Sequence, residues 1–252
     1  MRVLLWKELL EQWRSYRLLV VGAVLTVLGL SGPLSAYYLP QLLAQVPGMP
    51  AGLADLMPEP DLGMAVGEYL DNLLQIGVIL AILVPMAAVV GERVGGTAEI
   101  TLSKPVSRGA FLGAKFIAYG LTFSAGMALA SIAGYYYVGV LFEWLPPLKF
   151  LAVNAGMLLY LAVFVAISIL ASTLARSQLA AAGMGFGAMI PLGLLGAWPV
   201  LGPYLPGAIP AWARLALTQA ESAPAWAGFA GALGIILAAL VGAWLRLRRQ
   251  EL

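Results

Sequence analysis

Six long stretches without a single charged residue constrain this chain more than any other feature. They are Leu18–Leu39, Asn72–Val90, Phe116–Phe142, Phe150–Leu174, Leu179–Val200 and Pro224–Leu245. Each meets the length of about 20 mostly apolar residues that a helix needs to cross the hydrocarbon core of a bilayer. One central charge would cost about 2.5–3.5 kcal/mol and offset several leucines. The sequence therefore predicts an all-α, polytopic membrane protein with six transmembrane helices in a single domain, residues 1–252.

The composition agrees with lipid as the solvent of this chain. Hydrophobic residues make up 62% of the sequence and charged residues only 10%, whereas a soluble domain carries roughly 25% charged residues. The sequence contains neither cysteine nor histidine, which removes disulfides, thiolate nucleophiles, histidine catalysis and the usual zinc or haem ligands. We expect no metal site, no cofactor in this chain and no nucleic-acid partner.

The basic residues lie almost entirely on one side of the predicted spans. Six crossings place both termini on the same side as the loops at 91–115 and 175–178. That side holds twelve of the 14 Lys and Arg residues, and the other side holds only Lys149 and Arg214. Because cytoplasmic loops are enriched in Lys and Arg, we expect both termini in the cytoplasm and the protein in the plasma (inner) membrane.

The segment before the first span, residues 2–17, has an amphipathic pattern. Trp6, Leu9, Leu10, Trp13 and Tyr16 recur at steps of three and four, with charged residues largely on the other face. This pattern predicts an elbow helix that lies in the plane of the membrane, where tryptophans favour the headgroup layer. A simple cytoplasmic extension that anchors the first span is the alternative.

The long loop 91–115 carries a helix signal between two turns. Gly95 and Gly96 permit a tight turn, Thr97 can cap a short helix, and Glu99 suits its first turn. Pro105 ends that helix, and Ser107 can cap the next one, which runs into the third span. The sequence thus predicts a short cytoplasmic helix across the base of the spans. Each basic residue of the loop, such as Arg93 or Arg108, would also serve as an ordinary positive-inside anchor.

This loop resembles the first cytoplasmic loop of ABC transporter permeases of the type-2 class. The resemblance is carried by Glu92, Gly96-Thr97, Pro105-Val106-Ser107-Arg108 and Lys115, and by the Leu-Ala-Arg-Ser run at 174–177. It implies that separate ATPase subunits, which bind ATP and Mg, grip the loop as a coupling helix, and that a second permease subunit completes a homo- or heterodimer. The residues placed at this contact are Glu92, Arg93, Gly96, Thr97, Glu99, Pro105 and Arg108.

Absent motifs limit what the chain does alone. No GxxxxGK[ST] phosphate loop occurs, so this chain is not itself expected to be an enzyme, and ATP would be hydrolysed by a partner. The six uncharged stretches contain no ionisable Asp, Glu, Lys or Arg for ion coupling. We therefore expect the permease subunit of an ABC exporter. A non-transporting membrane scaffold or maturation factor is the first alternative, and a secondary carrier is the second.

Two further sets of residues are candidates for contact and transport. Gly183 and Gly187 form a GxxxG step that would let helices approach closely, either within the subunit or between two subunits. Gln75, Asn154 and Ser168 are polar residues inside predicted spans. They would line a largely apolar substrate path, although Asn154 could equally be bonded locally near a helix end.

Overall fold

The computed structural model describes residues 2–45, 59–96, 107–219 and 223–249, and every regular element in these ranges is helical. The α-helices are α1 (Arg2–Arg14), α2 (Arg17–Ala44), α3 (Leu62–Leu83), α4 (Val90–Val94), α6 (Arg108–Leu141), α7 (Pro147–Leu174), α8 (Gln178–Gly196), α9 (Ala208–Thr218) and α10 (Trp226–Arg248). A 3₁₀ turn, η2 (Gly202–Tyr204), precedes α9.

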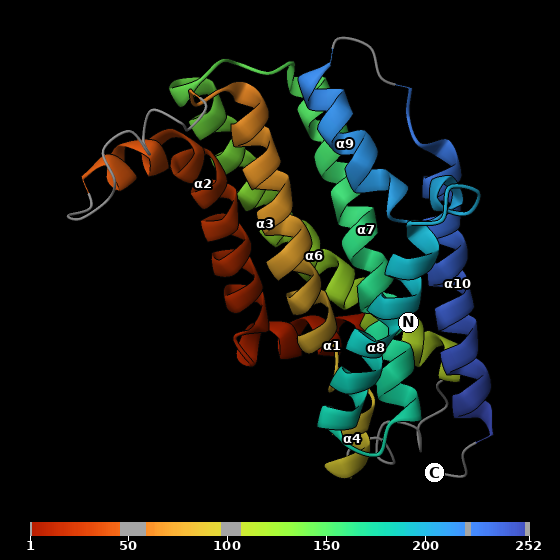
Figure 1. The fold of residues 1–252 in the computed structure, drawn as a ribbon. Helices are drawn as coiled ribbons and strands as arrows, with labels where there is room; N and C mark the ends of the chain where they lie inside the picture. Colours follow the sequence, from red (N-terminus) through yellow and green to blue (C-terminus); the bar gives the residue numbers. More distant parts are fainter. Residues whose placement is uncertain (1, 46–58, 97–106, 220–222, 250–252) are drawn as a thin grey trace.

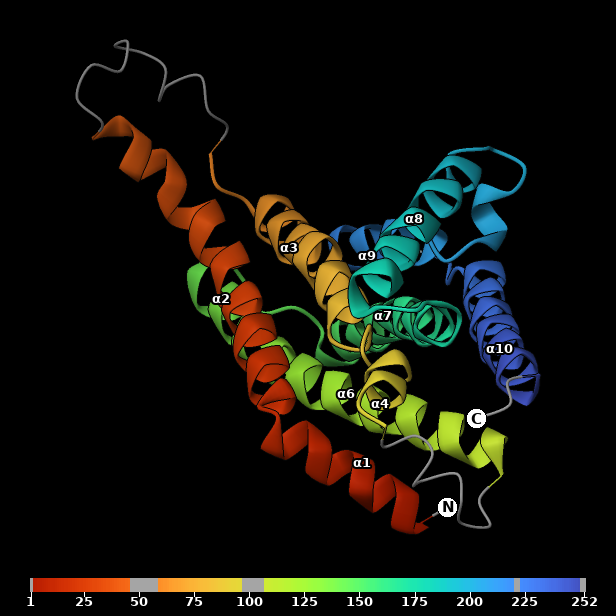
Figure 2. The same cartoon turned by 90° about the horizontal axis from the view of Figure 1, so that it is seen from below.

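Six helices in the described ranges are long and apolar enough to cross a membrane, which confirms the predicted fold class. They are α2 over Arg17–Leu39, α3, α6, α7, α8 and α10. These helices run side by side in a bundle, and α1 lies across one end of it (Figures 1 and 2). We call this end, which carries α1, α4 and the end of α10, the base. Helix α9 lies beside α3 and α7 at the opposite end.

Close backbone contact between α2 and its neighbours α3 and α6 forms one half of the bundle. A Cβ atom on Gly32 would lie 2.6 Å from the Tyr69 backbone, and one on Gly29 would collide with the Ala130 carbonyl. Only glycine fits at these two crossings. In lipid, where apolar surface alone does not drive helices together, such close backbone packing is a main source of association.

The second span begins and ends earlier than the predicted range of 72–90. Helix α3 begins at Leu62 because the Asp61 carboxylate accepts a hydrogen bond from the Met64 N–H at 2.7 Å and so caps it. Its outer turns carry Asp71, which pairs with Arg214 of α9. Pro85, just beyond the helix, lacks the N–H that would continue the ladder. Glu68 and Asp71, which precede the predicted span, are therefore part of the helix.

The third span begins where the sequence placed its cap. The Ser107 hydroxyl accepts from the Ala110 N–H at 3.1 Å, and α6 continues from Arg108 through the whole span. The predicted short helix between Thr97 and Lys104 lies outside the described residues.

Candidate functional site

At the base, α4 is bonded to the end of α7. The backbone N–H groups of Val89 and Val90 both donate to Ser172 Oγ, at 2.9 and 3.0 Å. The Arg93 guanidinium donates to the carbonyl oxygens of Thr173 (3.1 Å) and Ala175 (3.2 Å). The last carbonyl groups of a helix have no hydrogen-bond partner within that helix. Arg93 therefore donates to carbonyl groups at the end of α7 that the helix itself leaves unbonded. These bonds fix the point at which the chain leaves the bundle after α3.

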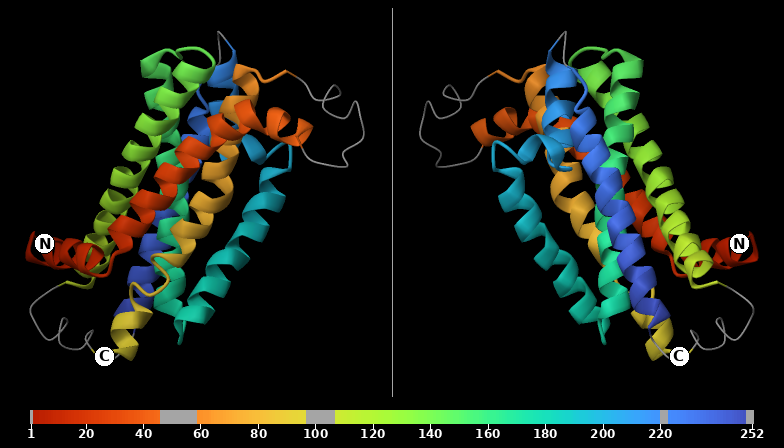
Figure 3. Two further views of the ribbon diagram at one scale, coloured as in Figure 1. Left: turned by 90° about the vertical axis from the view of Figure 1, so that its left-hand side faces the viewer. Right: turned by 90° about the vertical axis from the view of Figure 1, so that its right-hand side faces the viewer.

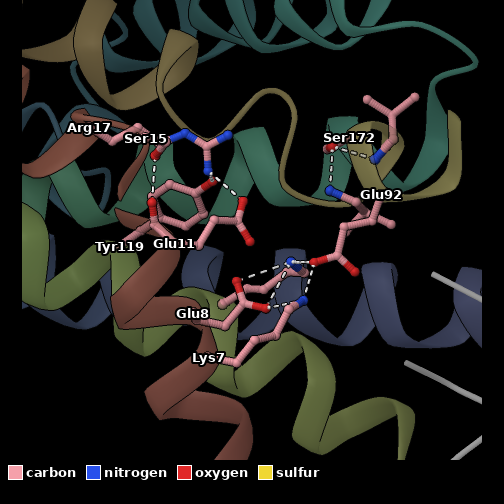
Figure 4. A network of polar contacts seen from close by, with 11 residues as sticks. Lys7, Glu8, Glu11, Ser15, Arg17, Glu92, Tyr119 and Ser172 are labelled. Atoms are coloured by element: carbon pink, nitrogen blue, oxygen red, sulfur yellow. Dashed lines mark hydrogen bonds and ion pairs between the residues drawn. The ribbon is translucent and has the colours of Figure 1, made fainter. Parts of the chain in front are cut away.

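A buried ion-pair cluster joins α1, α4 and α6 at the same level (Figure 4). Lys115 Nζ lies 3.1 Å from Glu8 Oε2 and 2.6 Å from Glu92 Oε1. Lys7 Nζ lies 2.7 Å from the same Glu92 oxygen and 3.2 Å from Glu8 Oε1. The side chain of Lys115 is 1% exposed and that of Glu8 is 2% exposed. Two ammonium groups and two carboxylates therefore form a balanced, largely dry set that we call the base cluster.

Glu92 and Lys7 of the base cluster have pKa values shifted in the directions that favour their charged forms. Burial raises the pKa of Glu92, but the charges and hydrogen bonds of Lys115 and Lys7 outweigh it, so the pKa lies below its ordinary value of 4.5. Burial lowers the pKa of Lys7, but its bonds to Glu92 and Glu8 outweigh that effect, and the pKa lies above 10.5. Both groups are therefore ionised at neutral pH.

The turn between α1 and α2 has its own polar contacts. Arg17 donates to the Glu11 carboxylate at 3.0 Å and to the Tyr119 hydroxyl of α6 at 3.1 Å (Figure 4). Tyr16 has a φ of 60°, a left-handed conformation that few non-glycine residues adopt. This residue lets the chain turn sharply from α1 into the first span, and the Arg17 contacts hold the turn against α6.

The segment 97–106 is anchored on both sides. Before it, Gly96 has a φ of +69°, and a Cβ added there would meet nothing within 4 Å. After it, Ser107 caps α6 and the Arg108 guanidinium donates to the Leu247 carbonyl near the end of α10. The residues that flank this segment are therefore linked to α1 and α6 by the base cluster, to α7 by Arg93 and to α10 by Arg108.

Three of the seven residues predicted for coupling flank that segment and bond within the chain, each to different helices: Glu92, Arg93 and Arg108. Gly96 lies in the turn after α4. Thr97, Glu99 and Pro105 lie outside the described residues. Sequence analysis named Lys115 only for the family resemblance and did not predict its pairing with Glu8 and Glu92, because the three residues come from separate segments.

The three polar residues of the predicted path are not brought together. Asn154 is buried, accepts from the Tyr69 hydroxyl and donates to the Phe150 carbonyl. Ser168 is buried and donates to the Ile82 carbonyl of α3. Gln75 is exposed on α3. Asn154 and Ser168 therefore link α7 to α3, and their hydrogen bonds are already made within the subunit.

Helix α8 is the least covered of the six spans. Nothing lies within 4 Å of a Cβ added to Gly183 or to Gly187, so these two glycines do not serve close packing within the described subunit. Near the far end of α8 an apolar cavity of about 690 Å³ opens between α7, α8, η2 and α9, lined among others by Tyr160, Phe164 and Trp198.

The carboxylates of Glu8, Glu11 and Glu92 place one oxygen each within 4.8 Å of one another. Two of them already bond to Lys7 and Lys115, and these ammonium groups supply the positive charge that a metal ion would otherwise bring. These ion pairs link α1, α4 and α6.

The fold and the base define a six-span helical membrane protein whose connection between α3 and α6 is bonded to several helices at once. The chain belongs to the ABC-2 transporter family, because the profile described as "ABC-2 family transporter protein" matches residues 2–252. It is also 30% identical to the "Uncharacterized transmembrane protein YxlG" of Bacillus subtilis, over 258 residues that cover 100% of this chain and 98% of that protein.

Proposed function

We propose that this chain is the permease subunit of an ABC exporter, and that a separate ATPase subunit drives it by docking on the segment between α4 and α6. The observation that supports this most is the anchoring of that segment to four helices of the bundle, by Glu92, Arg93 and Arg108. A mere connector would not need a buried ion pair before it and a guanidinium contact to another span after it. Membership of the ABC-2 transporter family supports the same function.

In the proposed cycle the ATPase binds ATP and Mg and closes, and the docked segment moves with it. The base cluster would transmit that displacement to α1 and α6, and the Arg108 contact would transmit it to α10. Lys115 of α6 is held by two carboxylates, from α1 and α4, at 3.1 Å or less. These three helices would therefore shift together rather than slide past one another. The spans of two permeases would then open an outward path.

The proposed orientation places the base in the cytoplasm, where an ATPase has access to ATP. Twelve of the 14 Lys and Arg residues belong to this side in the predicted topology. We further propose the plasma membrane as the location and a second permease, seated on α8, as the other membrane partner.

Affinity purification of the chain from its native membrane in mild detergent, with ATPase assay and subunit identification, tests this function. We expect an ATPase to co-purify with the wild-type chain. The variant Gly96→Trp should lose the ATPase or uncouple hydrolysis from solute movement in proteoliposomes, since it adds bulk beside the docking segment without touching the base cluster. Gly96→Ala is the matched control, because it imposes the same backbone strain at a φ of +69° without the added bulk.

Three results would contradict the proposal. Normal transport by Gly96→Trp would make the segment a connector only. ATPase binding without ATP-dependent solute movement would favour a scaffold. Flux driven by an ion gradient with no ATPase present would favour a secondary carrier.

A further inference from the structure

An apolar groove of about 470 Å³ lies between α1 and α6, on the side of α1 that faces the spans. Its walls include Leu9 and Trp13 of α1, Leu18 at the start of α2, and Leu121 and Ala125 of α6. Helix α1 projects sideways from the base (Figure 3). The groove is separate from the cavity beside α8.

One buried polar side chain faces this groove without a partner. Gln12 is 1% exposed, and neither its Nε2 nor its Oε1 makes a hydrogen bond of ordinary geometry to a described residue, although the Tyr119 hydroxyl lies beside it. A buried amide without a well-formed hydrogen bond is costly. An isosteric leucine would fit the apolar walls without that cost, so the amide indicates a ligand with at least one polar atom at this depth.

The contacts of α1 with α6 limit how far the groove can close. The pairs of Glu8 with Lys115 and of Arg17 with Glu11 and Tyr119 hold the middle and the last turn of α1 near α6. Helix α1 cannot sink against α6 to fill the space without breaking a buried ion pair. Trp6 and Trp13 are 65% and 71% exposed on this helix, as side chains at the headgroup level of a bilayer are.

We propose that the groove is a binding site for one anionic glycerophospholipid of the adjoining leaflet. Its acyl chain lies along Leu121 and Ala125, and its ester carbonyl accepts a hydrogen bond from Gln12 Nε2, while water of the ester region donates to Oε1. The charge of α1 selects the headgroup. Glu8 and Glu11 are paired inward, whereas Arg2 and Arg14 are exposed and form no ion pair with the described residues. The outward face of α1 is therefore basic, which attracts anionic lipid.

The site requires only that the chain is in a membrane, so it stands independently of the proposed transport function. The test uses the full chain in phosphatidylcholine nanodiscs that contain a small fraction of phosphatidylglycerol with a diazirine in its acyl chain. After illumination, cross-linked peptides are mapped by mass spectrometry. We expect labelling to concentrate on residues 6–13 and 118–125.

Filling the groove should abolish that labelling. Ala125 is exposed and lines the groove, so Ala125→Phe occupies the space without disturbing a packed contact, and we expect at least a fivefold loss of label. Ala128→Phe is the matched control, because Ala128 is exposed on the same helix but does not line the groove. Label spread evenly over α10 as well, or unchanged by Ala125→Phe, would mean annular lipid only and would overturn the proposal.

Gln12→Leu separates a lipid site from a structural amide. We expect it to raise the melting temperature in lipid-free detergent, since an unpaired buried amide is removed, and to lower the labelling severalfold. Labelling equal to wild type would overturn the role of Gln12. Unlabelled phosphatidylglycerol should compete severalfold better than phosphatidylcholine, and equal competition would overturn the selection of anionic headgroups.

Discussion

Lys115 is the most deeply buried charged side chain among the described residues, and both of its partners come from other helices. Removing an ammonium group from water has a large cost, which only close pairing offsets. Here Glu8 and Glu92 supply that pairing, and Lys7 balances the second carboxylate. The base cluster is thus a weak source of net stability but a strong constraint on where α1, α4 and α6 sit.

Replacing Lys115 with methionine should destabilise the protein strongly. The variant leaves Glu8 and Glu92 buried with one ammonium group between them, and loss of one partner of a buried pair costs about 3–5 kcal/mol. Equilibrium unfolding in mixed micelles measures the change. Lys149→Met, at an exposed lysine, should change the free energy of unfolding by about 0.5 kcal/mol or less. Adding Glu92→Gln to Lys115→Met restores charge balance and should recover part of the lost free energy of unfolding. Equal effects of Lys115→Met and Lys149→Met would show that the cluster is not desolvated.

The same cluster predicts how stability depends on pH. The pKa of Glu92 is lowered in the folded protein, so its contribution is fully present above 4.5 and is lost as pH falls through the lowered folded value. The pKa of Lys7 is raised, so its contribution is fully present below 10.5 and is lost as pH rises through the raised value. The stability difference between wild type and Glu92→Gln should therefore be flat from pH 5 to 9 and shrink below 4.5. A difference that instead changes between pH 5 and 8 would contradict these directions.

At the scale of elements, α1 is amphipathic in an unusual sense, because its polar face is turned toward the protein. Glu8 and Gln12 are buried, while Trp6 and Trp13 are exposed. In water this arrangement would leave large aromatic side chains in contact with solvent, whereas at a bilayer surface it places them in the headgroup layer. The structure therefore supports an interfacial position for α1, and that position stays a proposal.

Helix α4 offers a test of how the docking segment is held. Ser172 accepts two backbone hydrogen bonds from the start of α4, and Ser172→Ala leaves two buried N–H groups without an acceptor, at about 1–3 kcal/mol each. We expect faster hydrogen exchange at residues 89–94, measured by mass spectrometry, with the six spans unchanged. Ser124→Ala is the control, because Ser124 Oγ donates only within its own helix, to the Gly120 carbonyl. Equal exchange in both variants would show that α4 does not depend on Ser172.

The spans could be read from the sequence because they depend on the length of apolar segments, a local property. The start of α3 is set by the Asp61 cap, a signal that the search for uncharged stretches did not use, and the pairing of Asp71 with Arg214 joins residues far apart along the chain. The pairing of Lys115 could not be predicted either, because its two carboxylate partners come from separate segments. The glycine positions show most clearly which helix contacts a sequence pattern does not predict. Gly29 and Gly32 form the close crossings, and they occur without the GxxxG spacing that drew attention to Gly183 and Gly187.

At the scale of the whole molecule, the bundle is unevenly covered. Helix α7 is the most enclosed of the six spans and α8 the least, and α8 lies apart from α2 and α6 in the view along the bundle (Figure 2). A face that carries small residues with open space in front of them is suited to a second helix in lipid. This supports the proposal that α8 forms the contact with another permease subunit.

A homodimer through α8 predicts a specific disulfide. A two-fold contact brings a residue on its axis close to its own copy, and a disulfide requires Cα atoms within about 7 Å. The native chain has no cysteine, so single variants Gly183→Cys and Gly187→Cys can be oxidised in native membranes without background. We expect at least one to give a covalent dimer on non-reducing gels, while Gly234→Cys on α10, also facing open space, stays monomeric. Cross-linking of Gly234→Cys alone would move the interface to α10. Failure of all three, with a second, different permease recovered on purification, would make the pair heteromeric.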